Sequence, residues 1–248
     1  MGSNLDALEL TQDAFLGGKV QLWQPLAGYR AGVDPVLLAA SVPAKAGQSV
    51  LDLGCGVGAA ALCLGARVSG LSLFGVERQA AYVQLARRNG LDCVAADIGD
   101  LPADLRQMSF DHVICNPPYF DRTAGYAADD PGREGAMGED TPLGTWIDIA
   151  ARRLRPKGYL HLIHRADRLP ELLSFAQDRL GSLEVLPLAP RIGRAAELVI
   201  LRARKEGRAQ FRLHAPEIIH SAPKHEADVE DYNPRISSVL RNGNALIW

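Results

Sequence analysis

The stretch SVLDLGCGVG at residues 49–58 joins a short apolar run to three closely spaced glycines. The apolar run predicts a buried strand over 49–54, and the Ala/Leu-rich segment after it predicts a helix over 57–68. Glycines between a strand and a helix let the backbone approach a ligand closely, and the helix N-terminus offers free N–H groups. The stretch therefore predicts a strand–loop–helix unit with a binding loop at its centre.

The alternation of strands and helices continues along the chain. Strands are predicted over 71–77, 92–97, 110–119, 159–164, 183–190 and 195–205, and helices over 79–90, 141–158 and 168–181. Upstream, residues 19–22 predict a strand and 33–42 a helix with Asp34 as its N-cap. This order implies an α/β fold with a mostly parallel, seven-stranded sheet and helices on both faces. The last two strands have no helix between them, which predicts an antiparallel C-terminal strand.

Composition excludes several classes of protein. The 248 residues are 47% apolar and 23% charged, which excludes a wholly disordered chain. The formal charge of −2 argues against a simple polybasic nucleic-acid binder. The four cysteines lack C-x-x-C spacing and the six histidines lack metal-ligand spacing, so no metal site is predicted. Without a signal peptide or a membrane-spanning run, the chain is expected to be cytoplasmic with no membrane partner.

Acidic residues mark the ends of the first three core strands. Asp52 precedes the first glycine of the loop, Glu77 ends the next strand and Asp97 the third. Ligands of open α/β sheets bind outside the carboxyl ends of the strands, so Glu77 is placed for ribose hydroxyls and Asp97 for an adenine amino group. The loop is compatible with a dinucleotide or with S-adenosylmethionine (SAM). Asp52 favours SAM, because an acid there attracts the cationic amino-acid end of that cofactor.

A second motif, Asn116-Pro117-Pro118-Tyr119, follows the apolar strand HVIC. The two prolines fix φ and remove two donors, so the Asn116 side-chain oxygen and the Pro117 carbonyl can converge as acceptors. The matching partner is a planar amine with two N–H groups, and Tyr119 offers a face for stacking. Two hydrogen-bond acceptors stabilise the positive charge that develops on the amine nitrogen, and they thereby make this nitrogen a better nucleophile. The motif predicts methylation of an exocyclic amine, with these four residues as the catalytic set.

In combination, DLGCGVG, Glu77, Asp97 and NPPY resemble the class I, N6-adenine type of amino-methyltransferases, which have a Rossmann-like fold. The block GYRAGVDPVLLAA (28–40) and the NPPYF continuation look like a narrower bacterial family that methylates N6 of an anticodon-loop adenine in valine tRNA. The resemblance covers about residues 10–205. It implies that SAM is the cofactor and S-adenosylhomocysteine the product, and that the block around Arg30, Gly32 and Asp34 covers the cofactor. The expected cofactor-binding residues are Asp52, Gly54, Cys55, Gly56, Gly58, Glu77, Arg78, Asp97, Ile98, Asn116, Arg30 and Asp34.

The main hypothesis is a SAM-dependent methyltransferase acting on adenine N6 in RNA, with tRNA as the favoured class and the base flipped into the pocket. Residues 191–212 carry a local charge of +5 and are the candidate RNA-contacting surface, although a solvated strand edge explains them equally well. The segment 119–148 carries −5, and its part 119–141 is expected to be a lid or a mobile loop. The expected division is 1–48 as a cap over the cofactor site, 49–205 as the catalytic domain and 206–248 as an extension.

Other interpretations stay open. Release-factor glutamine N5, rRNA guanine N2 and DNA adenine N6 are also planar amines that this motif could serve. The short segment before the first core strand disfavours the release-factor enzymes, which carry an N-terminal helical domain. A non-catalytic SAM-binding module and an NAD-dependent oxidoreductase are less favoured. Neither His164 nor Trp146 is assigned to the site, because a structural histidine and a core tryptophan are the commoner uses of such residues.

Overall fold

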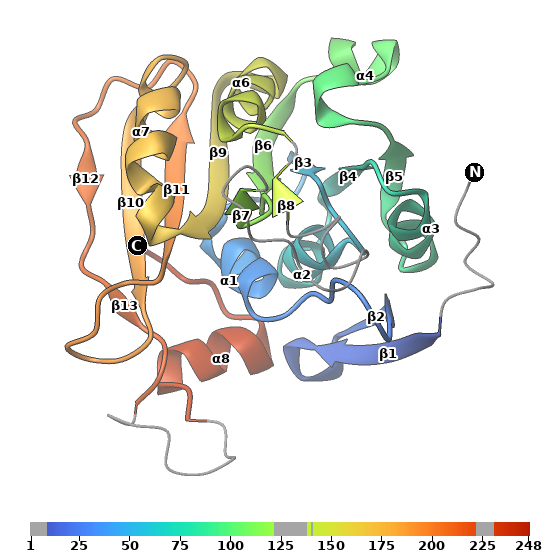
Figure 1. Ribbon diagram of the computed structural model, residues 1–248, viewed down its shortest axis with the longest axis horizontal. Helices are drawn as coiled ribbons and strands as arrows, with labels where there is room; N and C mark the ends of the chain where they lie inside the picture. The colour runs from blue at the N-terminus through green and yellow to red at the C-terminus, as the bar shows by residue number, and fades with distance from the viewer. Residues whose placement is uncertain (1–8, 122–137, 140, 222–230) are drawn as a thin grey trace.

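The computed structural model describes residues 9–121, 138–139, 141–221 and 231–248 of the chain. Its main sheet has the strand order β12-β10-β11-β9-β6-β3-β4-β5, with β13 paired to β10 (Figure 1). The parallel strands are β3 (Ser49–Leu53), β4 (Ser72–Glu77), β5 (Asp92–Ala95), β6 (Phe110–Cys115) and β9 (Leu154–Arg165).

The far side of the sheet carries its antiparallel strand. There β11 (Leu198–Arg204) runs antiparallel to both β9 and β10 (Gly181–Ala189). This confirms the predicted α/β fold with a mostly parallel sheet. In the extension 206–248, two short strands, β12 (Arg212–Leu213) and β13 (Glu217–Ile218), continue the sheet beyond β10.

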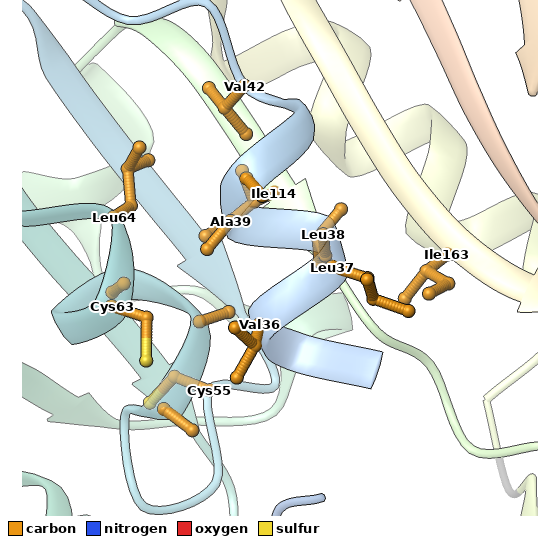
Figure 2. Packing of buried hydrophobic residues seen from close by; sticks show 14 of the residues in the cluster. Val36, Leu37, Leu38, Ala39, Val42, Cys55, Cys63, Leu64, Ile114 and Ile163 are labelled. Carbon is orange, nitrogen blue, oxygen red and sulfur yellow. The ribbon is translucent and has the colours of Figure 1, made fainter. Parts of the chain in front are cut away.

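Helices cover both faces of the sheet and form two separate cores. On one face lie α1 (Asp34–Ser41), α2 (Ala59–Arg67), α3 (Ala80–Arg88) and α8 (Pro234–Asn242), and on the other α4 (Ala103–Gln107), α6 (Leu143–Arg153) and α7 (Leu169–Gln177). Successive residues of a strand point to opposite faces, so Val50 packs in the first core and Leu51 in the second. Every side chain from Pro35 to Ser41 is buried, and Figure 2 shows α1 between Cys63 and Leu64 of α2 and Ile163 of β9.

An N-terminal hairpin docks beside α2 and α3. Its strands are β1 (Leu10–Phe15) and β2 (Val20–Pro25), of which the sequence predicted only the second. Asn89 fastens the hairpin to the core, because its side chain bonds both backbone groups of Trp23 and also donates to the Val57 carbonyl at 3.0 Å. Arg88 lies over the Trp23 ring at 3.9 Å.

Several predicted boundaries were wrong: the strand expected over 110–119 ends at Cys115, and the helix expected over 168–181 ends at Gln177. The sequence predicted a helix over 141–158, but α6 ends at Arg153 and β9 begins at once with Leu154 paired to Phe110 of β6. Pro156 cannot donate a helical hydrogen bond, and a bulge at Lys157 with φ of 68° brings the chain into the sheet. Within the described ranges, none of the helices is both long and apolar enough to cross a bilayer.

Candidate functional site

A cavity of about 390 Å³ opens at the carboxyl ends of β3, β4 and β6. This edge of the sheet is where the sequence placed both motifs. Among the predicted site residues only Gly58 does not line the cavity. Those that do are Arg30, Asp34, Asp52, Gly54, Cys55, Gly56, Glu77, Arg78, Asp97, Ile98, Asn116, Pro117, Pro118 and Tyr119.

The glycine loop between β3 and α2 depends on conformations that favour glycine. Gly54 has φ of 66°, and a Cβ on it would lie 2.5 Å from Cη2 of Trp146 on α6. Gly58 has φ of 89° and ends the loop as the N-cap of α2. Its position at the start of the helix explains why it shapes the loop without lining the cavity.

Two buried carboxyl groups stand beside the loop. Asp52 Oδ2 accepts a hydrogen bond from the Ala61 amide at 3.2 Å, and burial together with the nearby charge of Glu77 raises the pKa of Asp52 to about 8. Glu77 accepts from the amides of Gly56 at 3.1 Å and Gln79 at 2.8 Å, yet its burial still raises its pKa. Both groups would therefore be stabilised by a cationic ligand.

The other charged residues of the wall have different surroundings. Asp97 is exposed, and its Oδ1 accepts from the Gly99 amide at 2.8 Å at the start of a 3₁₀ turn. Arg30 forms an ion pair with Asp13 at 2.5 Å and donates to the Thr11 hydroxyl and the Pro25 carbonyl. Arg30 thus braces the β1–β2 hairpin, and the residue also lines the cavity.

The Asn-Pro-Pro-Tyr segment leaves β6 at the centre of the cavity wall. Asn116 Oδ1 is buried and accepts no hydrogen bond from the residues that the structure describes. His164 Nε2 lies 3.2 Å from the Pro118 carbonyl. Because a carbonyl only accepts, the proton sits on Nε2, and burial lowers the pKa of His164 to about 4 and keeps the ring neutral. A buried Oδ1 without a partner is a ready acceptor for a ligand N–H.

Tyr119 is held by residues from distant parts of the chain. Its hydroxyl donates to Asp34 Oδ2 at 2.6 Å, and its ring lies edge-on to His164 with centroids 5.2 Å apart. The sequence predicted Asp34 as an N-cap. In the structure α1 begins at Asp34 itself, and its carboxylate bonds Tyr119.

Several lining residues were not predicted. Burial raises the pKa of the Tyr29 phenol, and the nearby charges of Asp34, Asp52 and Glu77 raise it further. The hydroxyl of Tyr82 donates to the Tyr29 carbonyl at 3.0 Å, and Trp146 lines the cavity although it also packs in the core. Isolated aromatic residues produce no periodic pattern in a sequence. Only the position of Tyr29 in the block 28–40 could have indicated that it lines the cavity.

Cys55, an expected cofactor-binding residue, and Cys93 are both buried, and their sulfur atoms lie 3.5 Å apart. The expected lid or mobile loop at 119–141 falls mostly outside the described residues, which leave out 122–137 and 140.

The chain is similar in sequence to known methyltransferases. The family model of the methyltransferase small domain matches residues 31–173. The tRNA1(Val) (adenine(37)-N6)-methyltransferase of Porphyromonas gingivalis is 33% identical over 179 residues, which cover 65% of this chain and 67% of that protein. The Shewanella baltica protein of the same name is 30% identical over 186 residues, or 70% of this chain and 76% of that protein.

The fold has a solved counterpart. A protein from Agrobacterium tumefaciens, described as a predicted O-methyltransferase, superposes with a TM-score of 0.69 at 26% identity and covers 87% of this chain and 99% of its own. The family match spans more than half of the chain and includes both the glycine loop and the NPPY segment. The chain belongs to the methyltransferase small domain family and is a SAM-dependent methyltransferase.

Proposed function

We propose that this protein transfers the methyl group of SAM to the exocyclic N6 amine of an adenine in tRNA. The observation that carries the proposal is the buried Oδ1 of Asn116 at the cavity wall, which accepts no hydrogen bond from the described part of the chain. The names of the Porphyromonas and Shewanella relatives support adenine and tRNA as the substrate.

The cavity suits the cofactor. We assign the cationic amino-acid end of SAM to the side of Asp52, and the ribose to Glu77, because both buried carboxyl groups gain from hydrogen-bond donors or a positive charge. Asp97 and Ile98 would contact the adenine moiety, and Arg78 would stand at the rim. The loop residues Gly54, Cys55 and Gly56 leave room for the ligand, and SAM supplies an electrophilic methyl group when it is bound.

The target amine would be held by Asn116 and Pro117. Asn116 Oδ1 and the Pro117 carbonyl would each accept one N–H, while Tyr119 stacks on the base. The Pro118 carbonyl already accepts one hydrogen bond from His164. Two acceptors favour the positive charge that forms on N6 as the N–C bond forms and the S–C bond breaks. The methylated nitrogen is acidic, so water can take its proton without a dedicated base.

The RNA-contacting surface needs a narrower definition than residues 191–212. In the structure, Lys205 donates to the carbonyls of Ala151 and Leu154, and Arg202 is paired with Glu184. The side chains of Lys205 and Arg202 therefore stabilise the fold. Arg194 is exposed in the turn between β10 and β11, at the edge of the sheet that also carries Asn116. We propose Arg194 as a phosphate contact.

The test is to incubate the protein with labelled SAM and separate fractions of tRNA, rRNA, genomic DNA and release factor. Each nucleic-acid fraction comes from a strain that lacks the gene, and its nucleosides are analysed by mass spectrometry. We expect label as N6-methyladenosine in tRNA. Label in rRNA guanine, in DNA or on a glutamine side chain would contradict the proposal and identify the actual acceptor.

A further inference from the structure

We propose that Asp34 is a positioning residue for Tyr119, and that it holds the ring that stacks on the target base instead of binding the cofactor. This inference rests on the proposed function and deepens it. It also assigns a different role to the N-terminal block, which the sequence alone places over the cofactor.

The hydroxyl end of Tyr119 is anchored on a rigid helix. Its oxygen lies 2.6 Å from Asp34 Oδ2, at the first residue of α1. The next seven residues of α1 are all buried, so the carboxylate stands on an element that cannot easily shift. Burial raises the pKa of Asp34, and the hydrogen bond from Tyr119 acts against that rise.

The other side of the ring is held from β9. His164, which is fully buried, meets the Tyr119 ring edge-on at an interplanar angle of 70°. The same imidazole donates to the carbonyl of the preceding residue, Pro118. The phenol is thus fixed at its hydroxyl, at its edge and through the adjacent backbone. A stacking face fixed in this way presents the base to the methyl donor in one orientation, which raises the rate of transfer.

The experiment compares four proteins: wild type, Asp34→Ala, Tyr119→Phe and the double variant. We expect each single variant to lower kcat on tRNA by about tenfold, with the SAM dissociation constant unchanged within about twofold. The double variant should be no slower than Tyr119→Phe, because Asp34 acts through the hydroxyl that this substitution removes. Asp34→Asn, whose amide oxygen still accepts the hydroxyl, should recover most of the lost kcat.

Two results would overturn the inference. One is weaker SAM binding in Asp34→Ala regardless of the residue at 119, which would make Asp34 a cofactor ligand. The other is additive losses of kcat in the double variant. If Asp34→Ala does not fold, Tyr119→Phe decides alone, since an unchanged kcat there refutes a role for the bond.

Thermal unfolding of the same four proteins reports the bond without any substrate. Non-additive shifts of Tm support it, and additive shifts contradict it. If the Tm shifts are non-additive but the folded wild type methylates no tRNA, the proposed function is contradicted. The inference about the Asp34–Tyr119 bond would then still be supported.

Discussion

The two halves of the cavity differ in their electrostatics. The half formed by β3 and β4 contains the buried carboxyl groups Asp52 and Glu77, and the pKa of each is raised. The half formed by β6 and β9 contains the neutral groups Asn116, Tyr119 and His164. The first half is suited to a cation and the second to a neutral, planar amine. One cavity can therefore hold an electrophile and a poor nucleophile side by side.

The halves also differ in how complete they are without ligands. Burial raises the pKa of Asp52 and of Glu77, although the charge of Arg78 acts against the shift at Glu77. A bound cation would therefore stabilise the ionised form of each carboxyl group. The base half is already braced by Asp34 and His164, and among the described residues no donor reaches Asn116 Oδ1 or His164 Nδ1. We therefore expect SAM to stabilise the fold strongly and the substrate to find a preformed site.

The largest effect is expected from removing the acceptor of the base half. Asn116→Ala should lower kcat by roughly 100- to 1000-fold, since it removes a hydrogen bond that strengthens as charge develops. SAM affinity, measured by calorimetric titration, should remain within about threefold because the carboxyl groups are untouched. Full turnover in this variant would refute the acceptor role.

Gly54→Ala tests the geometry of the cofactor half. The new Cβ would lie 2.5 Å from the Trp146 ring, at a φ of 66°. We expect roughly 2 to 4 kcal/mol of lost stability from overpacking and backbone strain, measured by chemical denaturation. Gly47→Ala is the matched control, because Gly47 has φ of 85° and open space around it. The Gly47→Ala variant should lose only about 1 to 2 kcal/mol of stability. Equal losses in the two variants would contradict a clash between the new Cβ and Trp146.

Asp52→Asn separates the stability of the ligand-free protein from cofactor binding. A carboxyl with a folded pKa of about 8, well above its unfolded value near 4, binds more protons in the folded state. The free energy of unfolding of the wild type should therefore fall as pH rises from about 4 to 8. The variant should show a shallower fall and a higher Tm at pH 8, yet bind SAM about tenfold more weakly.

The pH dependence of binding gives a further check on Asp52. SAM affinity of the wild type should rise as pH approaches 8 and the carboxylate forms, a trend that Asp52→Asn should lose. Asp92→Asn is the control, because Asp92 is exposed at the start of β5, on the opposite edge of the sheet. A SAM affinity of Asp52→Asn that follows pH as the wild type does would contradict this assignment.

The smallest effect concerns the rim of the base half. Arg194→Ala should raise KM for tRNA about threefold and reduce its salt dependence, with kcat and SAM affinity unchanged. Arg208→Ala is the control, because Arg208 is exposed beside Gly207, which packs on Gly181 at the opposite end of β10. Similar effects of the two substitutions would indicate a diffuse charge effect instead of a contact.

The sequence located the cavity well because its two motifs are local. DLGCGVG and NPPY each follow a buried apolar strand, and parallel strands bring Asp52, Glu77 and Asn116 to one edge. The roles of these residues remain predictions until they are tested. The sequence also placed the helix that became α1, but it missed the hairpin strand β1 and did not locate the edge strands β12 and β13 within the extension 206–248. Each of these is short, and each forms only because a neighbouring strand is available.

By itself the sequence determined the alternation of strands and helices, the glycine loop and the acceptor motif, because periodicity, glycine placement and proline geometry act within a few residues. Only the tertiary structure decided which side chains brace these motifs. The Asp34–Tyr119 bond joins residues 85 positions apart, and His164 reaches Pro118 across 46. Such contacts depend on how α1 and β9 pack around β6, and long-range packing leaves no local pattern in the chain.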